Sequence, residues 1–425
     1  MADATGGILV GPDVELDGVS FDSRSIEPGQ LFVALRAERD GNEFVPAALA
    51  GGAAAVLADT APGGGTSVVV ADTAEALMRL GQWGRSQLAA DVIGVTGSVG
   101  KTSTKDLAKA ALSAGLRTAA NERSFNNEQG LPVTILNAPD DTEALVLEMG
   151  MRGFGEIARL CEVGRPTIGV VTRVAAAHTE RVGGIEGVVR AKSELILALP
   201  PTGTAILNAD DPNVMSIGGR SPCAVVTFGL SGAADVRIVD LVLDNLARPR
   251  FALHTPWGSA RVELAVSGAH MAVNAAAAIA VAAACGVDLE AAASALSGAP
   301  LSPWRMEMAI TSRGTVVIND AYNANPASMC AAIETLAALP IRGRRVAVLG
   351  VMAELADPVT DHASITRLLH EHGIELIAVG TDLYGVSPSD DPLHAVASLA
   401  GDDALLIKGS RVAGLERLAA LVVGQ

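Results

Sequence analysis

The chain has 425 residues, of which 49% are hydrophobic and only 3% aromatic, so its cores must be built from Ala, Val, Leu and Ile. This length predicts two to four domains, and the 45 glycines suit α/β layers joined by tight turns. A net charge of −16 argues against nucleic acids and anionic membranes as partners, because their phosphates would be repelled. Four widely spaced cysteines predict buried free thiols, and we expect neither a signal peptide nor a membrane span, which together indicate a cytoplasmic protein.

Residues 1–88 are expected to form a small N-terminal α/β domain. It contains three short strands and one helix, predicted at Leu31–Leu35, Ala53–Leu57, Ser67–Val70 and Val45–Ala50. The turn Asp22-Ser23-Arg24 places a carboxylate, a hydroxyl and a guanidinium side by side. From its chemistry alone, this segment is best interpreted as a surface turn.

The segment from Gly94 to Lys105 reads Gly-Val-Thr-Gly-Ser-Val-Gly-Lys-Thr-Ser-Thr-Lys and lies between an apolar strand and a helix. This order is typical of a P-loop, in which backbone N–H groups and the helix N-terminus bind phosphates. Lys101 would reach the outer phosphates and Thr102 would ligate Mg²⁺. Val95 stands where the consensus has its first glycine, and an ordinary glycine-rich turn is the competing interpretation. The Gly-Lys-Thr triplet favours a nucleotide site without indicating its reaction.

From Asp91 to about residue 300, strands alternate with helices, which predicts a central parallel sheet covered on both faces. The strands are expected at Val92–Val95, Ala144–Leu147, Thr167–Thr172 and Thr204–Leu207. Each leads into a polar residue, namely Thr96, Glu148, Arg173 and Asn208. Because ligands bind at the carboxyl edge of such sheets, these residues predict a single site.

Three polar side chains of this region have both a structural and a functional interpretation. Glu148 follows the strand beside the P-loop and is either a Mg²⁺ ligand or a capping or surface acid, with equal support. His178 is in a position where a lone histidine is more often a structural hydrogen-bonding residue, and Lys192 is by default a solvated helix residue. None of the three decides the function alone.

Residues 301–425 repeat the strand–helix rhythm, which predicts a Rossmann-like C-terminal domain. Its strands are expected at Thr315–Ile318, Arg345–Leu349, Leu376–Val379 and Ala404–Ile407, with helices over 327–339 and up to Val423. The segment lacks glycines spaced for a dinucleotide, so a second cofactor has little support there.

Several segments are specific enough to indicate a family. They are Asp22–Arg24 with Pro28–Leu35, Thr96–Thr102, Phe125–Asn127 with Gly130–Pro132, Glu148–Gly150, Gly155–Ala158, Arg305–Glu307, Tyr322–Pro326 and Lys408–Arg411. With them, nearly the whole chain resembles the ATP-dependent Mur ligases of peptidoglycan precursor synthesis. The Phe-Asn-Asn and Tyr-Asn-Ala-Asn-Pro segments look like those of the family member that joins D-alanyl-D-alanine to UDP-N-acetylmuramoyl-tripeptide.

This resemblance implies a role for each domain. Residues 1–88 would bind the UDP-linked muramoyl peptide, 89–300 would bind ATP, and 301–425 would receive the dipeptide. The reaction would pass through an acyl phosphate and release ADP and phosphate, in a protein expected to act as a monomer. Its catalytic residues would be Lys101, Glu148, His178 and Lys192. Two Mg²⁺ ions would be held by Thr102, Glu148, His178 and a carbamylated Lys192.

The same resemblance implies the binding residues. ATP would contact Gly97, Ser98, Val99, Gly100, Lys101, Thr102, Ser103, Asn274, Arg305 and Asp320. The other substrates would contact Ser23, Arg24, Asn126, Asn127, Tyr322, Asn323 and Asn325.

The chain also departs from the family pattern, although it keeps every expected catalytic side chain. Arg173 and two alanines intrude before His178, Met271 replaces an asparagine, Val351 replaces an acid and Ala321 replaces a serine. Three other functions stay open. They are a paralogous amide ligase with a different acid or amine, such as folylpolyglutamate synthase, a P-loop kinase or nucleotide switch, and a catalytically silent binding module.

Overall fold

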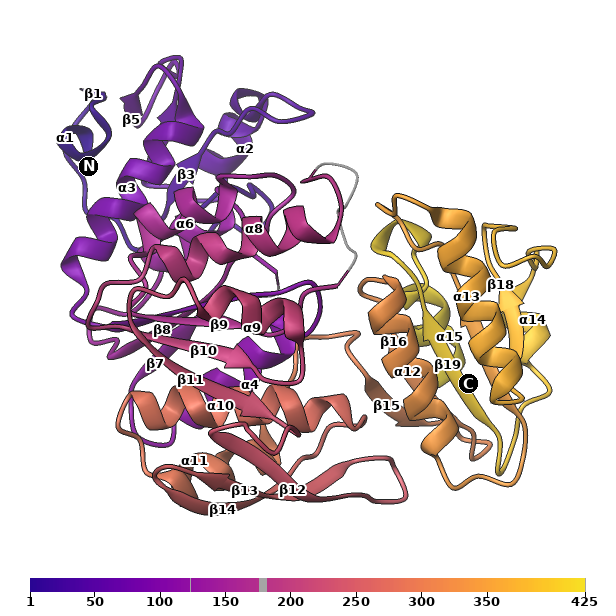
Figure 1. The fold of residues 1–425 in the computed structure, drawn as a ribbon. Coiled ribbons are helices and arrows are strands. Elements are labelled where there is room, and N and C mark those ends of the chain that lie inside the picture. The colour runs from indigo at the N-terminus through magenta and orange to yellow at the C-terminus, as the bar shows by residue number, and fades with distance from the viewer. Residues whose placement is uncertain (123, 176–181, 425) are drawn as a thin grey trace.

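The computed structural model describes residues 1–122, 124–175 and 182–424. In this described part, the strands form three sheets that follow one another along the chain (Figure 1). The N-terminal unit lies against the central one, and the C-terminal unit stands beside the central unit (Figure 1). The expected α/β class with three units is confirmed. The predicted boundaries, after residues 88 and 300, fall between the sheets and remain predictions.

The N-terminal sheet has the strand order β1-β5-β4-β3-β2, in which only β1 is antiparallel to its neighbour. Its strands are β1 (Ile8–Val10), β2 (Val19–Ser20), β3 (Leu31–Val33), β4 (Ala55–Ala58) and β5 (Thr66–Val69). Its helices are α1 (Ala2–Thr5), η1 (Gly41–Phe44), α2 (Val45–Ala50) and α3 (Thr73–Gln87). All four residues of β4 are buried, as expected of a central strand covered on both faces.

Contacts between α3 and the central unit hold the first two units together. Helix α3 is not among the elements predicted from sequence, although Asp72 caps it by accepting the N–H groups of Ala74 and Glu75. The helix packs against α5 (Gly130–Leu136) of the central unit. Just after α5, the Asn137 side chain accepts the N–H of Val19 at 2.7 Å and donates to its carbonyl at 2.9 Å. Asn137 therefore completes the edge of the N-terminal sheet.

The central sheet has the strand order β14-β13-β12-β11-β10-β9-β6-β8-β7. Its strands are β6 (Asp91–Thr96), β7 (Thr118–Ala120), β8 (Ala144–Glu148), β9 (Ile168–Val171), β10 (Thr204–Asn208), β11 (Ala224–Gly229), β12 (Val236–Leu243), β13 (Pro249–Thr255) and β14 (Gly258–Glu263). The strands β6 to β12 all run parallel to one another, whereas β13 and β14 extend the sheet as antiparallel strands beyond β12. The last four strands are not predicted from sequence. Strands β12 to β14 follow β11 without helices between them, so they lack the strand–helix rhythm.

Alternation along the buried strands sends side chains to both faces of the central sheet. Ile93 and Val95 pack with α4 and α10 on one face, and Val92 packs with α6 and α8 on the other. The helices are α4 (Lys101–Leu112), α6 (Glu156–Gly164), α8 (Ile185–Leu197), α9 (Pro212–Gly218), α10 (His270–Ala284) and α11 (Leu289–Ala295), followed by η2 (Leu296–Gly298). The alanine-rich α10 is a packed helix, as predicted. No helix in the described residues is long and apolar enough to cross a membrane.

The C-terminal sheet has the strand order β15-β16-β19-β17-β18, with β15 antiparallel at one edge. Its strands are β15 (Glu307–Ile310), β16 (Val316–Asp320), β17 (Arg345–Leu349), β18 (Glu375–Ala378) and β19 (Ala404–Lys408). Its helices are α12 (Pro326–Ala338), α13 (Pro358–Glu371), α14 (Pro392–Val396), η3 (Arg411–Ala413) and α15 (Glu416–Val423). The four predicted strands are present within a residue or two of their predicted ends.

The predicted burial of all four cysteines is wrong for three of them. All four are free thiols, but only Cys161 is buried, while Cys223, Cys285 and Cys330 are partly exposed. Cys285 follows the last residue of α10 and Cys223 precedes β11, where the neighbouring elements cover a side chain only partly. Burial raises the pKa of Cys161 to about 12, which makes this thiol unreactive.

Asn137→Ala should weaken the contact between the first two units. The change leaves both backbone groups of Val19 without their partner, which is expected to lower the free energy of unfolding by about 1–3 kcal/mol. Urea unfolding monitored by far-UV circular dichroism would measure the loss. Asp141→Asn, which touches only an exposed ion pair with Arg117, is the control and should change stability by less than about 0.5 kcal/mol. Equal effects of the two changes would contradict the role given to Asn137.

Candidate active site

A cavity of about 1010 Å³ opens where the carboxyl edge of the central sheet faces the C-terminal unit. Glu148, Arg173 and Asn208 line it from the ends of neighbouring strands, as predicted. The amide of Asn208 also donates to the carbonyl of Thr172 at 2.7 Å, which joins two of these strand ends. Thr96 ends β6 beside them, but its side chain is fully buried.

Two glycines give the turn between β6 and α4 its shape. A Cβ atom at Gly97, whose φ is +153°, would lie 1.9 Å from Oγ1 of Thr172. A Cβ at Gly100, whose φ is +84°, would lie 2.8 Å from Oδ1 of Asn274. Only glycine fits such positions. Because Gly100 also has no side chain to cap α4, the N–H groups at the start of the helix are available to an anion.

Glu148 is the buried carboxylate of the site, with 1% of its surface exposed. Its Oε2 accepts a hydrogen bond from Oγ1 of Thr102 at 2.6 Å, and its Oε1 accepts one from Nδ2 of Asn126 at 2.7 Å. Asn121 accepts the backbone N–H of Glu148 at 2.9 Å, which fixes the end of β8. Each carboxylate oxygen keeps a further lone pair, so Glu148 can still bind a donor or a cation.

Lys101 is the first residue of α4, and its ammonium donates to the carbonyl of Gly97 at 2.8 Å. Burial lowers the pKa of Lys101; the charge of Glu148 opposes this shift and that of Arg305 adds to it. The ammonium is thus held inside the glycine turn, beside the place where phosphates would lie.

Lys192 lies on α8 and lines the cavity with only 2% of its surface exposed, so the solvated interpretation of this lysine is wrong. Burial, with repulsion from Lys101, holds the pKa of Lys192 well below its usual range. Burial therefore shifts this side chain toward its neutral amine form. The predicted ligand His178 lies outside the described residues. Within the described ranges, no group of three or more His, Cys, Asp and Glu residues is placed to hold a metal ion.

The first turns of α10 supply another part of the wall. Asn274 is buried, and its amide donates to Sδ of Met271 at 3.5 Å, so one departure from the family pattern contacts a predicted ATP residue. His270 also lines the cavity. Burial lowers the pKa of His270 to about 4, with the charge of Asp320 opposing this shift and the charges of Lys408 and Arg173 adding to it.

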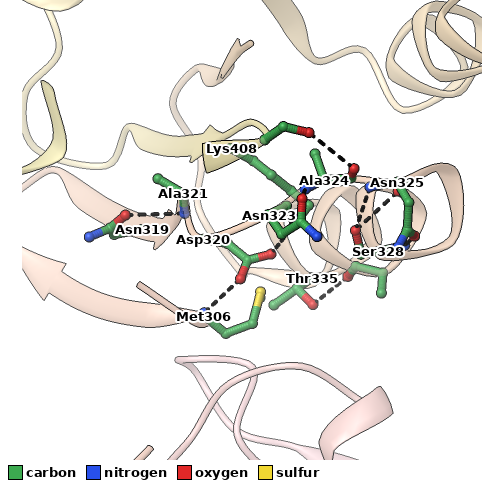
Figure 2. A network of polar contacts seen from close by, with 12 residues as sticks. Met306, Asn319, Asp320, Ala321, Asn323, Ala324, Asn325, Ser328, Thr335 and Lys408 are labelled. Carbon is green, nitrogen blue, oxygen red and sulfur yellow. Dashed lines mark hydrogen bonds and ion pairs between the residues drawn. The ribbon is translucent and has the colours of Figure 1, made fainter. Parts of the chain in front are cut away.

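The opposite wall belongs to the C-terminal unit. Asp320 and Lys408 are paired residues at the carboxyl ends of the parallel strands β16 and β19. The ammonium of Lys408 donates to Oδ2 of Asp320 at 2.5 Å and to the carbonyl of Asn323 at 2.8 Å. Figure 2 shows these residues at one end of the C-terminal sheet. Oδ1 of Asp320 accepts the N–H of Met306 at 3.1 Å. Asn325 caps α12 through a reciprocal pair of bonds with Ser328, which ends the loop (Figure 2).

Arg305 joins the central and C-terminal walls. Its guanidinium lies over the ring of Tyr322 at 4.2 Å and donates to Oγ of Ser124 at 3.3 Å. Its Nε is buried and has no hydrogen-bond partner in the part of the chain that the structure describes. A buried donor left unpaired is unfavourable, which indicates a position prepared for an acceptor on a ligand.

Most of the predicted binding residues meet at this cavity. Those that line it are Ser98, Val99, Gly100, Lys101, Thr102, Ser103, Asn126, Asn127, Glu148, Lys192, Asn274, Arg305, Asp320, Tyr322, Asn323 and Asn325. Ser23 and Arg24 do not line it, and Arg24 is exposed in a pair with Asp22 at 2.6 Å. Their turn nevertheless lies beside the cavity wall, because Phe21 contacts Phe125 with ring centroids 5.6 Å apart.

Other residues of the cavity wall have no role predicted from sequence, among them His270, Lys408, Ser410 and Arg411. The segment Lys408–Arg411 is visible as a family motif, but its sequence does not show that Lys408 is buried against Asp320. Asn126 is predicted to contact substrate, and the structure shows in addition that it holds Glu148.

His270→Gln should remove a pH dependence of stability. The unfolded ring binds a proton near pH 6.5 and the folded ring only near pH 4, so the folded protein loses stability as pH falls between these values. Glutamine does not titrate. Between pH 7.5 and pH 5.0, the variant should therefore lose less unfolding free energy than the wild type, by about 1 kcal/mol for this partly buried ring. Urea unfolding at the two pH values measures the difference, and equal losses would contradict the desolvation of His270.

Comparisons with known proteins agree with this architecture. The Mur ligase middle domain matches residues 95–282, and the Mur ligase, glutamate ligase domain matches residues 304–411. A UDP-N-acetylmuramoyl-tripeptide–D-alanyl-D-alanine ligase of Mycobacterium tuberculosis is 42% identical over 394 residues, which cover 85% of this chain and 77% of the relative. The Escherichia coli K12 protein of the same name is 34% identical, with 98% of this chain and 96% of the relative covered.

Solved structures show the same relationship. MurF from Acinetobacter baumannii superposes with a TM-score of 0.89 at 31% identity, covering 100% of this chain and 98% of that one. MurF ligase from Thermotoga maritima, solved in complex with ADP, gives a TM-score of 0.84 at 26% identity, covering 97% and 99%. The chain belongs to the Mur ligase family and, within it, to the MurF-type ligases.

Proposed function

We propose that the protein uses ATP to join D-alanyl-D-alanine to UDP-N-acetylmuramoyl-tripeptide, forming an amide, ADP and phosphate in peptidoglycan precursor synthesis. The observation that carries this proposal is a shared cavity: the P-loop residues Lys101 and Thr102, with Glu148, face the loop Tyr322–Asn325 across it. A ligase needs such an arrangement, because the activated acid must meet the amine before water reaches it. The names of the relatives supply the two substrates.

The ADP complex of the Thermotoga relative supports ATP as the nucleotide. Its phosphates would bind on the turn from Gly97 to Ser103, at the start of α4. Lys101 would exchange its bond to the Gly97 carbonyl for the outer phosphates. Arg305, with its unpaired Nε, would bind a nucleotide oxygen. Asp320 only accepts hydrogen bonds as a carboxylate, so its partner on ATP would be a hydroxyl or amino group rather than a phosphate.

Mg²⁺ fits the groups that are present beside the turn. Thr102 and Glu148 offer oxygen ligands, which Mg²⁺ prefers, and the phosphates would offer more. We propose that Lys192 carries a carbamate, since carbon dioxide reacts with the neutral amine that its burial favours. The carbamate would add another carboxylate and His178 a further ligand. When bound, the cations neutralise the charge gathered on the phosphates.

The reaction would proceed in two displacements. The terminal carboxylate of the tripeptide attacks the γ-phosphorus, which forms an acyl phosphate and releases ADP. The free amine of D-alanyl-D-alanine then attacks the acyl carbon, forms the amide and releases phosphate. Arg305 would help to keep water out between these steps, because it contacts Tyr322 on one wall and Ser124 on the other.

The N-terminal unit would hold the UDP end of the acid substrate, through Ser23 and Arg24. The contact between Phe21 and Phe125 places their turn next to Asn126 and Asn127, which line the cavity. We also propose that the enzyme is a monomer that acts in the cytoplasm.

Phosphate release should depend on all three substrates. With ATP and Mg²⁺ present, omission of either D-alanyl-D-alanine or UDP-N-acetylmuramoyl-tripeptide is expected to reduce the rate at least a hundredfold, measured with a coupled phosphate assay. Equal turnover with D-alanine alone, or with another acid, would assign the protein to a paralogous ligase. Sustained ADP formation with the acid alone, at the same rate with and without an amine, would indicate a kinase.

Lys192→Ala should abolish ligation and be partly rescued by a small carboxylic acid. Acetate or formate at high concentration would replace the missing carboxylate and is expected to restore activity at least tenfold over the unrescued variant. Arg190→Ala on the same helix is the control, and it should retain activity and gain nothing from the acid. Absence of rescue in a variant that is folded and still binds ATP would contradict the carbamate.

A further inference from the structure

The segment Lys408-Gly409-Ser410-Arg411 has no part in the reaction as proposed above. Its first residue, Lys408, carries a charge but has only 2% of its side chain exposed. The ammonium contacts Asp320 Oδ2 and the Asn323 carbonyl (Figure 2). One acceptor belongs to the proposed ATP site, and the other belongs to the loop proposed to receive the dipeptide. A single buried cation therefore links the two.

The sheet fixes the position of this lysine. Lys408 is the last residue of β19, paired with Asp320 on β16 and with Leu349 on β17. Because both neighbouring strands run parallel to β19, all three strand ends open toward the cavity. A lysine loses much rotamer freedom when buried, and an unpaired buried charge is unfavourable. The strand pairing fixes the backbone of Lys408, and the two acceptors, Asp320 and the Asn323 carbonyl, fix the position of its ammonium.

Ser410 extends the same linkage. Its hydroxyl donates to the carbonyl of Ala324 at 3.3 Å and accepts the N–H of Ala353 at 2.9 Å. Its own N–H donates to the carbonyl of Val351 at 2.9 Å. The segment that begins with Lys408 thus connects the loop after β16 to the loop after β17, where Val351 departs from the family pattern.

We infer that Lys408 is a positioning residue that holds the Asp320 carboxylate and the Tyr322–Asn325 loop in one arrangement, and so sets the affinity for ATP and for the incoming dipeptide together. The inference rests on the proposed function, which assigns a ligand to each of these two parts. An ion pair that only stabilised the fold would instead change stability without distinguishing among the three substrates.

Lys408→Met tests this role, because methionine keeps an unbranched stem and removes the ammonium. The KM values for ATP and for D-alanyl-D-alanine should each rise at least tenfold, while the KM for UDP-N-acetylmuramoyl-tripeptide stays within twofold. Arg344→Met is the matched control. It breaks another ion pair of the C-terminal unit, with Glu375 at 2.6 Å, away from the residues that line the cavity, and should change none of the three values.

Asp320→Asn separates the two contacts of Lys408, because its amide oxygen can still accept from Lys408, while its NH2 group replaces the oxygen that accepts the Met306 N–H. This variant should raise the KM for ATP alone. The double variant Asp320→Asn with Lys408→Met removes both buried charges and leaves neither unpaired, so it is the form to measure if Lys408→Met does not fold. Compared with Asp320→Asn, the double variant should show a KM for D-alanyl-D-alanine at least tenfold higher.

The inference is overturned if a folded Lys408→Met raises all three KM values equally or lowers kcat alone. It is also overturned if the double variant and Asp320→Asn have the same KM for the dipeptide. Failure of the proposed function looks different, because the wild type would then show no phosphate release that depends on the dipeptide. In that case, calorimetric titration of ATP into the wild type and Lys408→Met still decides whether Lys408 positions Asp320.

Discussion

The geometry of the site depends on one buried carboxylate. Glu148 ends β8 with almost none of its surface exposed, and an ionised carboxylate in such a place must be satisfied by donors or cations. Thr102 reaches it from the first turn of α4, and Asn126 reaches it from the loop that precedes α5. The glycine turn can only present Thr102 in this way because Gly97 lets β6 pass close to Thr172. The ends of β6 and β8, the start of α4 and the loop before α5 are therefore all held in place around the Glu148 carboxylate.

The three units meet at the segment from Ser124 to Asn127. Phe125 contacts Phe21 of the N-terminal unit, Ser124 accepts a bond from Arg305 of the C-terminal unit, and Asn126 holds Glu148 of the central unit. Just before this segment, the carbonyl of Asn121 accepts a hydrogen bond from the ammonium of Lys105 at 2.7 Å. A displacement of the N-terminal or the C-terminal unit would therefore shift this segment and, through Asn126, the Glu148 carboxylate.

The parts that sequence predicts well are those whose signal is local. The P-loop is recognised from a continuous run of residues, and the polar strand ends follow from a strand–helix rhythm that places them on one edge. The parts it does not predict depend on distant segments. Burial makes Lys192 a candidate for carbamylation, although its own neighbours on the helix look solvated. Lys408 and Asp320 are 88 positions apart and meet only because β16 and β19 pair. The strands β12 to β14 follow β11 without intervening helices, so they do not show the strand–helix rhythm.

The bond between Lys101 and the Gly97 carbonyl has a thermodynamic consequence. Because the Gly97 carbonyl satisfies the ammonium, a phosphate must compete with this carbonyl for Lys101. Phosphate binding thus exchanges one hydrogen-bond partner of Lys101 for another, so the net binding free energy is smaller than the charge of the lysine suggests. In return, the bond fixes the shape of the turn, so that a ligand causes little reordering of it. A site built this way binds a nucleotide less tightly and so favours its release.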